Sequence, residues 1–253
     1  SSSGTDSAGI YLTESDGIAI DAVAVTVTEL ESDSEDDTVT DSSQSDLTSG
    51  TNGNIVLAAT TGNIVLNIGT NLGTAAVSAN GSGNILIDAL AGSVTANADV
   101  VSSTGHITMK SGTNLALTDG VAVATGTDGT ISLDAEGGRL TMVGTAMVTA
   151  TGSSLRVAAS GNIALGNLTA VNVSVISSGG AITNATGSTK NVTATNLRLE
   201  SDDAIGVSAR HLTLNVVTVT ANSAGTDSNG IYLTEDSAIT VDTVAVTVTE
   251  FNA

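Results

Sequence analysis

A five-residue pattern constrains this fold more than any other feature: glycine, a variable residue, then apolar residues at alternate positions. It occurs at 53–57, 62–66, 83–87, 105–109, 129–133, 138–142 and 161–165. Apolar residues at every second position are typical of half-buried β-strands. Glycine suits corners where the backbone needs conformations that other residues rarely adopt. The pattern therefore predicts short strands separated by tight corners.

The strands fall into groups of three. Ile85, Ile107, Ile131 and Leu155 open successive groups, at spacings of 22, 24 and 24 residues by subtraction. Three short strands per 22–24 residues make one coil of a three-faced β-helix, and parallel crossovers are right-handed by default. No stretch has the 3.6-residue apolar spacing of an amphipathic helix. We predict an all-β, right-handed parallel β-solenoid. Second strands are expected at Val94, Leu115, Leu140 and Ile163, and third strands around Val100, Val121, Met147 and Val171.

The composition supports thin aliphatic layers in place of a globular core. The chain has one Phe, two Tyr and no Trp, yet 40% of its residues are apolar. Val, Ile and Thr favour strands because their branched side chains pack well on a pleated surface. Proline, which would interrupt a hydrogen-bonded ladder, is absent.

A second, longer period spans the whole chain. Residues 4–30 return as 225–251, with a constant offset of 221 and 19 identities in 27 aligned positions. We predict one continuous solenoid over 1–253, with one repeat at 4–224 and the start of the next at 225–253. No capping segment is recognisable at either end, so the ends resemble cuts through a longer array. The expected partner is therefore the same repeat, stacked head to tail or covalently continued.

An acidic segment, 29–49, interrupts the strand pattern. We expect a loop ejected from the solenoid wall, within which Thr38-Val39-Thr40 could form a strand. Counting coil openers near 10, 55, 85, 107, 131, 155, 182 and 205 gives eight coils per repeat, a rise of roughly 38 Å. Calcium takes six to eight oxygen ligands, and the loop offers carboxylates but no EF-hand spacing. A solvated loop is the preferred interpretation, and calcium binding is the alternative, with Asp33, Glu35, Asp36 and Asp37 as candidate ligands.

Charge and site chemistry argue against several functions. A net charge of −20 disfavours nucleic acid and anionic membrane surfaces as partners. There is no cysteine, and no apolar run of about 18 residues that would predict a transmembrane helix. Alternation places His106 and His211 on the outside, as surface histidines and not metal ligands. Neither a catalytic triad nor clustered basic residues can be recognised, so we do not expect an enzyme or a cofactor other than calcium.

Gly-Asn-Ile-x-Leu motifs occur in pairs about nine residues apart over most of 50–220. These motifs resemble the β-helical repeats of filamentous-haemagglutinin-like large exoproteins and of giant bacterial surface proteins. The resemblance implies an exported protein that works as a stiff stalk or an adhesin. We expect a structural element of an extracellular, cell-surface fibre. The alternatives are an adhesin stalk that binds host or neighbouring cell-surface glycans, and a carbohydrate-binding or carbohydrate-active β-helix.

Overall fold

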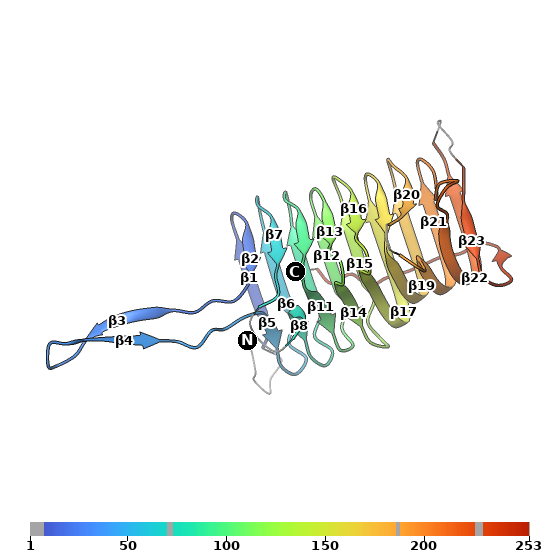
Figure 1. Cartoon of the computed structure of the whole chain (residues 1–253). Helices are drawn as coiled ribbons and strands as arrows, with labels where there is room; N and C mark the ends of the chain where they lie inside the picture. Colours follow the sequence, from blue (N-terminus) through green and yellow to red (C-terminus); the bar gives the residue numbers. More distant parts are fainter. Residues whose placement is uncertain (1–7, 70–72, 186–187, 226–229, 253) are drawn as a thin grey trace.

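The computed structural model describes residues 8–69, 73–185, 188–225 and 230–252. Residues 4–7 and 226–229 of the long repeat lie outside the described residues. Throughout the described ranges the chain forms strands and turns and no helix. Parallel strands stack in two large sheets of 15 and 7 strands (Figure 1). The predicted all-β parallel solenoid with three strands per coil is confirmed.

The first face of the solenoid carries the coil openers in one parallel register. Ile10, Ile55, Ile85, Ile107, Ile131, Leu155, Val173, Leu197, Val219 and Val241 stand above one another, which marks ten successive coils in the described part of the chain. The strands of this face alone are β1 (Ile10–Glu14), β6 (Ile55–Ala59), β9 (Ile85–Ala89), β12 (Ile107–Ser111), β15 (Ile131–Ala135) and β24 (Thr240–Val241).

The second face is a separate sheet of three-residue strands, in which both outer residues of most strands are buried and the middle one is half-buried. Its strands are β2 (Ile18–Ile20), β7 (Ile64–Leu66), β10 (Val94–Ala96), β13 (Leu115–Leu117), β16 (Leu140–Met142), β18 (Ile163–Leu165) and β20 (Ile182–Asn184). The third face begins with β5 (Leu47–Ser49), β8 (Ala75–Ala79), β11 (Asp99–Ser102) and β14 (Ala122–Thr125), and it also contains β23 (Leu233–Glu235).

In the later coils the third and first faces join. Four long strands each run from the third face of one coil onto the first face of the next: β17 (Met147–Ala159), β19 (Asn167–Ser177), β21 (Val192–Ser201) and β22 (Leu212–Ser223). The prediction that Ile182 and Ile205 open coils is therefore wrong. Ile182 lies in β20 on the second face, and Ile205 forms a bridge with it there. The openers are Val173 and Leu197, which follow no glycine corner because the strand continues straight into them.

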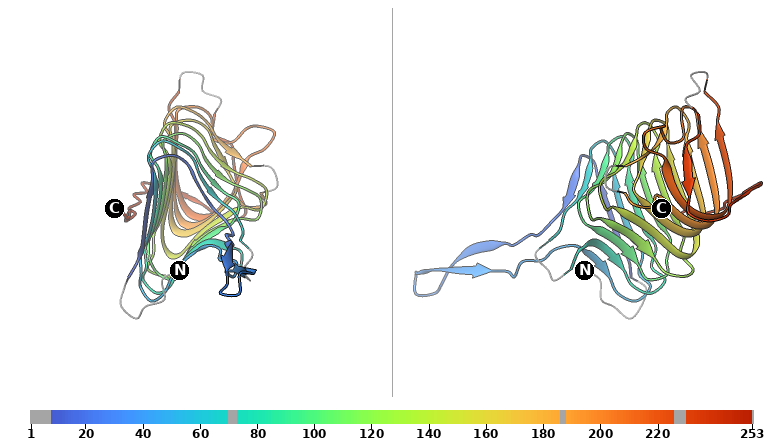
Figure 2. Two further views of the ribbon diagram at one scale, coloured as in Figure 1. Left: turned by 90° about the vertical axis from the view of Figure 1, so that its left-hand side faces the viewer. Right: turned by 45° about the vertical axis from the view of Figure 1, so that its right-hand side comes forward.

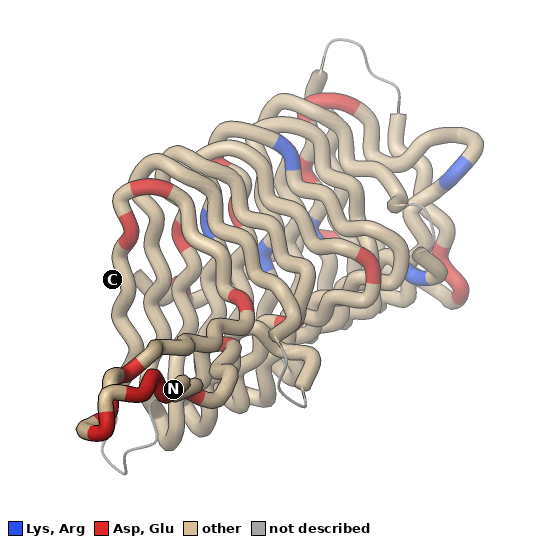
Figure 3. Tube along the Cα trace, turned by 60° about the vertical axis from the view of Figure 1, so that its left-hand side comes forward, with Lys and Arg blue, Asp and Glu red and all other residues tan. Residues whose placement is uncertain are grey.

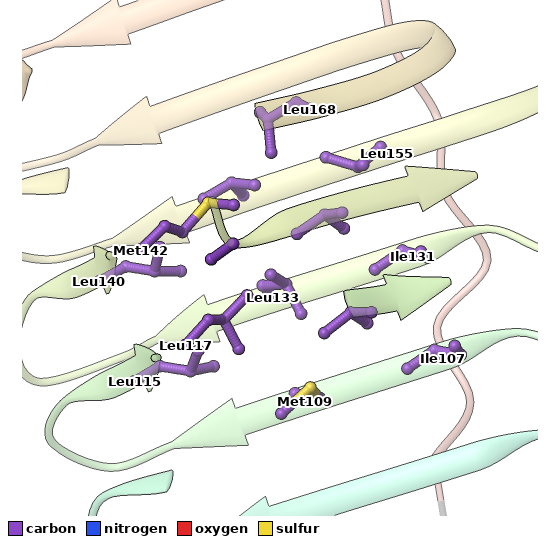
Figure 4. Packing of buried hydrophobic residues seen from close by; sticks show 14 of the residues in the cluster. Ile107, Met109, Leu115, Leu117, Ile131, Leu133, Leu140, Met142, Leu155 and Leu168 are labelled. Carbon is purple, nitrogen blue, oxygen red and sulfur yellow. The ribbon is translucent and has the colours of Figure 1, made fainter. Parts of the chain in front are cut away.

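The core is a set of aliphatic ladders inside the three faces (Figure 4). Ile107, Leu115, Ile131 and Leu133 are fully buried, and each lies above or below a residue of similar size in the neighbouring coil. Burial of apolar area stabilises by about 25 cal/mol per Å², so a repeated layer of aliphatic side chains holds each coil to the next without aromatic bulk.

Glycines form a column at the corner before the first face. A Cβ on Gly83 would lie 2.3 Å from the carbonyl oxygen of Gly53, and one on Gly105 would lie 2.0 Å from that of Gly83. A Cβ on Gly129 would lie 2.2 Å from the oxygen of Gly105. Only glycine therefore allows neighbouring coils to approach at the ladder spacing, which explains why the sequence pattern begins with this residue.

The acidic segment forms an antiparallel hairpin. Strands β3 (Thr26–Leu30) and β4 (Asp36–Thr40) pair with one another and project beyond the first coil, roughly along the stack (Figure 1). β4 contains the strand anticipated at 38–40. The segment outside the wall is displaced from the expected 29–49. It begins earlier, because the chain leaves the wall after β2 and forms β3 from Thr26, and it ends earlier, because Leu47–Ser49 forms β5 and pairs with β8.

The two copies of the long repeat occupy different faces. Leu12 lies on the first face of the first coil, and its copy Leu233 on the third face of the ninth. Ala19 lies on the second face of the first coil, and its copy Thr240 on the first face of the tenth. Both comparisons give an offset of eight coils and two further faces. Ile231, the copy of Ile10, instead bridges Ile205 on the second face, which is an offset of eight coils and one face, so the two copies are not related by one rotation along their whole length. At about 4.8 Å per coil the repeat rises roughly 40–42 Å.

Candidate functional site

The C-terminal residues 242–252, which we call the strap, lie across the outer surface of the first face. The strap leaves the wall after β24 and runs back over β22, β21, β19, β17, β15 and β12 (Figures 1 and 2). It crosses these strands in the direction of the N-terminal end of the stack. The same crossing is visible behind the core residues in Figure 4.

Alternate side chains of the strap face the wall. Val244 is buried and Val246 and Val248 are half-buried, whereas Ala245 and Thr247 between them are exposed. This period of two is that of an extended strand with one face covered. The strap is therefore a bound segment with its own apolar face.

Hydrogen bonds fix the far end of the strap. The hydroxyl of Thr130 donates to the carbonyl oxygen of Thr249 at 2.7 Å, and the N–H of Thr249 donates to the same hydroxyl at 3.1 Å. The N–H of Phe251 donates to the hydroxyl of Thr108 at 2.9 Å. These outward-pointing threonines thus satisfy backbone groups that no neighbouring strand pairs, which gives the strap a defined register.

Glu250 forms the electrostatic centre of this contact. Its carboxylate lies 3.2 Å from Lys110 Nζ and 3.8 Å from Arg156, and it accepts a 2.9 Å hydrogen bond from Ser132. Burial by itself raises the pKa of Glu250, but the Ser132 hydroxyl and the charges of Lys110 and Arg156 together outweigh it. The pKa of this carboxyl therefore lies below its usual value of 4.5.

The outer first face is less acidic than the rest of the molecule. Three of the six basic residues of the chain, Lys110, Arg156 and Arg198, occupy outward positions on its strands. Arg156 also pairs with Asp134 at 2.9 Å, and Arg198 with Glu200. Near the start of the strap, a groove of about 550 Å³ remains between it and the wall. The groove is lined by Arg198, Leu199, Glu200, Thr220, Asn222, Val241, Asp242, Thr243 and Val244.

The candidate calcium ligands lie at the tip of the hairpin. Asp33 Oδ1 accepts the N–H of Glu35 at 3.1 Å, and Asp37 Oδ1 accepts that of Thr38 at 2.8 Å. Asp36 begins β4 and its side chain is exposed. Within the described ranges no three acidic or histidine side chains gather closely enough to hold a metal ion. Calcium binding at Asp33, Glu35, Asp36 and Asp37 stays a prediction.

Both histidines lie at corners, half-buried. The Asn54 carboxamide oxygen accepts the N–H of Asn84 at 2.9 Å, and that of Asn84 accepts the N–H of His106 at 2.8 Å. The His106 Nδ1 in turn accepts the N–H of Thr130 at 3.1 Å. His106 is thus one rung of a ladder of side-chain acceptors that satisfies corner N–H groups. His211 stacks at a tilt against Tyr232, with ring centroids 5.7 Å apart.

Comparisons with known proteins give no relative to guide the assignment: no family model, no curated protein and no solved structure matches the chain. In the described residues, no helix is long and apolar enough to cross a membrane. The fold and the strap therefore define the class by themselves, a parallel β-solenoid whose outer wall binds an extended segment. Sequence reasoning missed this surface, although the return of Val-Ala-Val-Thr-Val-Thr-Glu outside the regular coils was a signal for it.

Acidification is expected to release the strap. The pKa of Glu250 is lowered in the bound strap, so its carboxylate stabilises the contact at full strength above about pH 4.5, and this contribution disappears as the pH falls through the lowered pKa. Phe251 is the only phenylalanine, so its ring resonances in NMR spectra report strap binding. We expect them to shift toward free-peptide values below pH 4.5. Glu250→Gln should remove this step, and a step of the same size in the variant would contradict the assignment to Glu250.

Proposed function

We propose that the chain is a structural element of an extracellular bacterial surface fibre, built from β-solenoid repeats stacked along one axis. The observation that carries the proposal is the return of the same segment at both ends of the stack. Residues 10–20 pair in parallel with the second coil, and their copies at 231–241 pair in parallel with the coil before them. One repeat can therefore be followed by the next without a change in strand direction.

The strands at the N-terminal end support growth along the axis. Among the described residues, β1 and β2 are the edge strands of their sheets. On β1, Tyr11 is 64% exposed and Leu12 is 38% exposed. An apolar edge with free backbone donors and acceptors is a template for a further strand. A second solenoid end that offers the matching edge would extend both sheets at once.

The regular ladder also suits a stiff element. From the first to the ninth coil, neighbouring coils are tied by backbone hydrogen bonds on all three faces and by the aliphatic column inside. Solenoids of this kind resist bending because each repeat contacts its neighbours over a full cross-section. The resemblance to filamentous-haemagglutinin-like exoproteins, the cell-surface location, and the adhesive and carbohydrate-active alternatives stay predictions.

Electron microscopy of the concentrated chain tests the proposal. We expect unbranched rods whose cross-section is that of a single coil and that lengthen with protein concentration. The N–H of Ile10 donates to Asn54, so alternation directs the N–H of Thr13 to the free edge. Thr13→Pro removes that donor and blocks the edge, and should shorten the rods strongly.

Thr13→Ser keeps the N–H and is the matched control, expected to assemble like the native chain. Separate compact particles at every concentration would contradict the proposal. Rods of equal length in the proline variant would show that they do not grow from this edge.

A further inference from the structure

One heptapeptide of this chain has two structures. Residues 23–29 and 244–250 are identical, and the second copy is the central part of the strap. In the strap its valines face the wall. In the hairpin the corresponding Val23, Val25 and Val27 are 63%, 51% and 47% exposed. The first copy thus carries the same apolar face as the strap, but without a surface beneath it.

The hairpin has little to hold it in place. β3 and β4 pair only with each other in the described part of the chain, and all ten of their residues are exposed. An isolated two-stranded hairpin is marginally stable in water. Leu30 and Val39 add to the exposed valines. An exposed apolar strand of this kind marks an interaction site.

Both copies leave the solenoid at the same point of the repeat. The hairpin follows Ile18–Ile20, and the strap follows Thr240–Val241, which is the copy of residues 19–20. Both then run toward the N-terminal end of the stack (Figures 1 and 2). The strap finds the wall of the preceding coils there, whereas the hairpin extends beyond the first coil. A repeat placed before this one, with the offset seen between the two copies, would offer its first face to the hairpin.

The hairpin sequence fits the contacts that hold the strap. Glu29 corresponds to Glu250, which binds Lys110, Arg156 and Ser132. Leu30 replaces Phe251, so this position stays apolar. Glu31 replaces Asn252, whose side-chain oxygen accepts a 3.2 Å hydrogen bond from Lys110 Nζ. The hairpin would therefore bring a second carboxylate to Lys110.

Charge adds to this complementarity. Between Glu29 and Asp41 the chain has seven acidic residues, and they gather on the projecting hairpin (Figure 3). The outer first face carries half of the basic residues of the chain, Lys110, Arg156 and Arg198, and three acidic ones, Asp88, Asp134 and Glu200, so it is near neutral where the rest of the chain is strongly acidic. Interfaces between opposite charges favour correct docking and fast association.

We propose that, in the fibre, strand β3 of each repeat docks across the first face of the preceding copy, in the seat that the strap occupies here. The proposal rests on the stacking of repeats and adds to it a lateral clamp. The partner is a second copy of this repeat, and the binding segment is 21–31. Each junction between repeats is then held by backbone ladders at the coil edges and by β3 laid over the outer wall.

A peptide experiment tests the clamp. A fluorescein-labelled peptide of residues 21–31 is titrated into a variant that ends at Val241, in which the seat is empty, and binding is followed by fluorescence anisotropy. We expect saturable binding to the variant and at least about tenfold weaker binding to the full chain, whose own strap competes for the seat. Charge reversal of the peptide, Glu29→Lys, should weaken binding by about tenfold or more.

A matched wall variant locates the bound peptide. Lys110→Glu should weaken binding of the native peptide and partly restore binding of the Glu29→Lys peptide. The two substitutions together exchange the charges of one ion pair, so opposite charges face each other again. A peptide with the same composition in scrambled order is the control for non-specific binding. Absence of binding to the folded variant, or binding that is insensitive to both charge changes, would overturn the proposal.

Two further measurements keep the outcome unambiguous. If the variant ending at Val241 fails to fold, full-length Glu250→Lys, with a weakened strap, takes its place and should bind the peptide more tightly than the native chain does. Fibre images are recorded from the same samples. If fibres form but the peptide does not bind, the docking of β3 is contradicted and the proposed stacking of repeats is still supported. If the peptide binds but no fibres form, the binding site for β3 is supported and the proposed fibre is contradicted.

Discussion

Replacing Gly105 with alanine is expected to destabilise the solenoid by about 3 kcal/mol, because the added methyl group has no space. The new Cβ would lie 2.0 Å from the carbonyl oxygen of Gly83 and 2.5 Å from its carbonyl carbon. Both atoms belong to the backbone of the neighbouring coil, so no side-chain rotation can relieve the overlap. The two coils would have to separate at this corner, which weakens the ladder hydrogen bonds of β9 and β12.

Gly73→Ala is the matched control for this prediction. A Cβ at position 73 meets no atom of the described residues within 4 Å. Its free energy of unfolding should differ from that of the native chain by no more than about 0.5 kcal/mol. Urea unfolding followed by far-UV circular dichroism measures both variants. Equal stability of the two would mean that neighbouring coils do not approach at the corner glycines as described.

The second large effect is expected at the centre of the aliphatic ladder. Leu133 is fully buried and lies between Met109 and Val157 of the neighbouring coils. Leu133→Ala removes buried methyl groups and leaves a cavity that rigid ladders on both sides cannot close. The expected loss is about 3–4 kcal/mol of unfolding free energy.

Leu90→Ala makes the same chemical change at a corner where the side chain is 63% exposed. We expect a loss of no more than about 0.5 kcal/mol there. The comparison separates burial in the solenoid from any general effect of leucine removal on strand formation. Similar losses at positions 133 and 90 would contradict the assignment of the inward face.

Much of the coil arrangement could be predicted from the sequence because local chemistry repeats. The pattern that opens at Ile85, Ile107 and Ile131 requires glycine at the corner and aliphatic residues inside, and both requirements are visible in the residue types. The second strands at Val94, Leu115, Leu140 and Ile163 also lie where their spacing placed them. In this part of the chain each coil is built by its own residues and differs little from the next.

The prediction failed where the corner chemistry changes. After Leu155 the chain no longer turns at glycine between the third and first faces, and long strands such as β19 pass through the corner. Val173 and Leu197 therefore open coils without the expected pattern. Ile182 and Ile205 show apolar alternation but belong to the second face. Alternation identifies a strand, and only the partner strands decide which face it occupies.

The outer surface could not be predicted in the same way. The heptapeptide at 23–29 and 244–250 has one sequence and two environments, a projecting hairpin and a bound strap. Its alternation predicts an extended strand with one apolar face in both places. Whether this apolar face is covered depends on whether the wall of a preceding coil lies next to the segment. The sequence of the segment does not decide this, because it depends on how the coils are stacked.

Fibre diffraction or helical reconstruction of assembled material tests the central claim most directly. Stacked repeats should give a spacing of about 4.8 Å along the fibre axis together with a longer repeat of roughly 40–42 Å. Compact separate particles, or fibres with the 4.8 Å spacing but no longer repeat, would contradict the stacking of intact solenoid units.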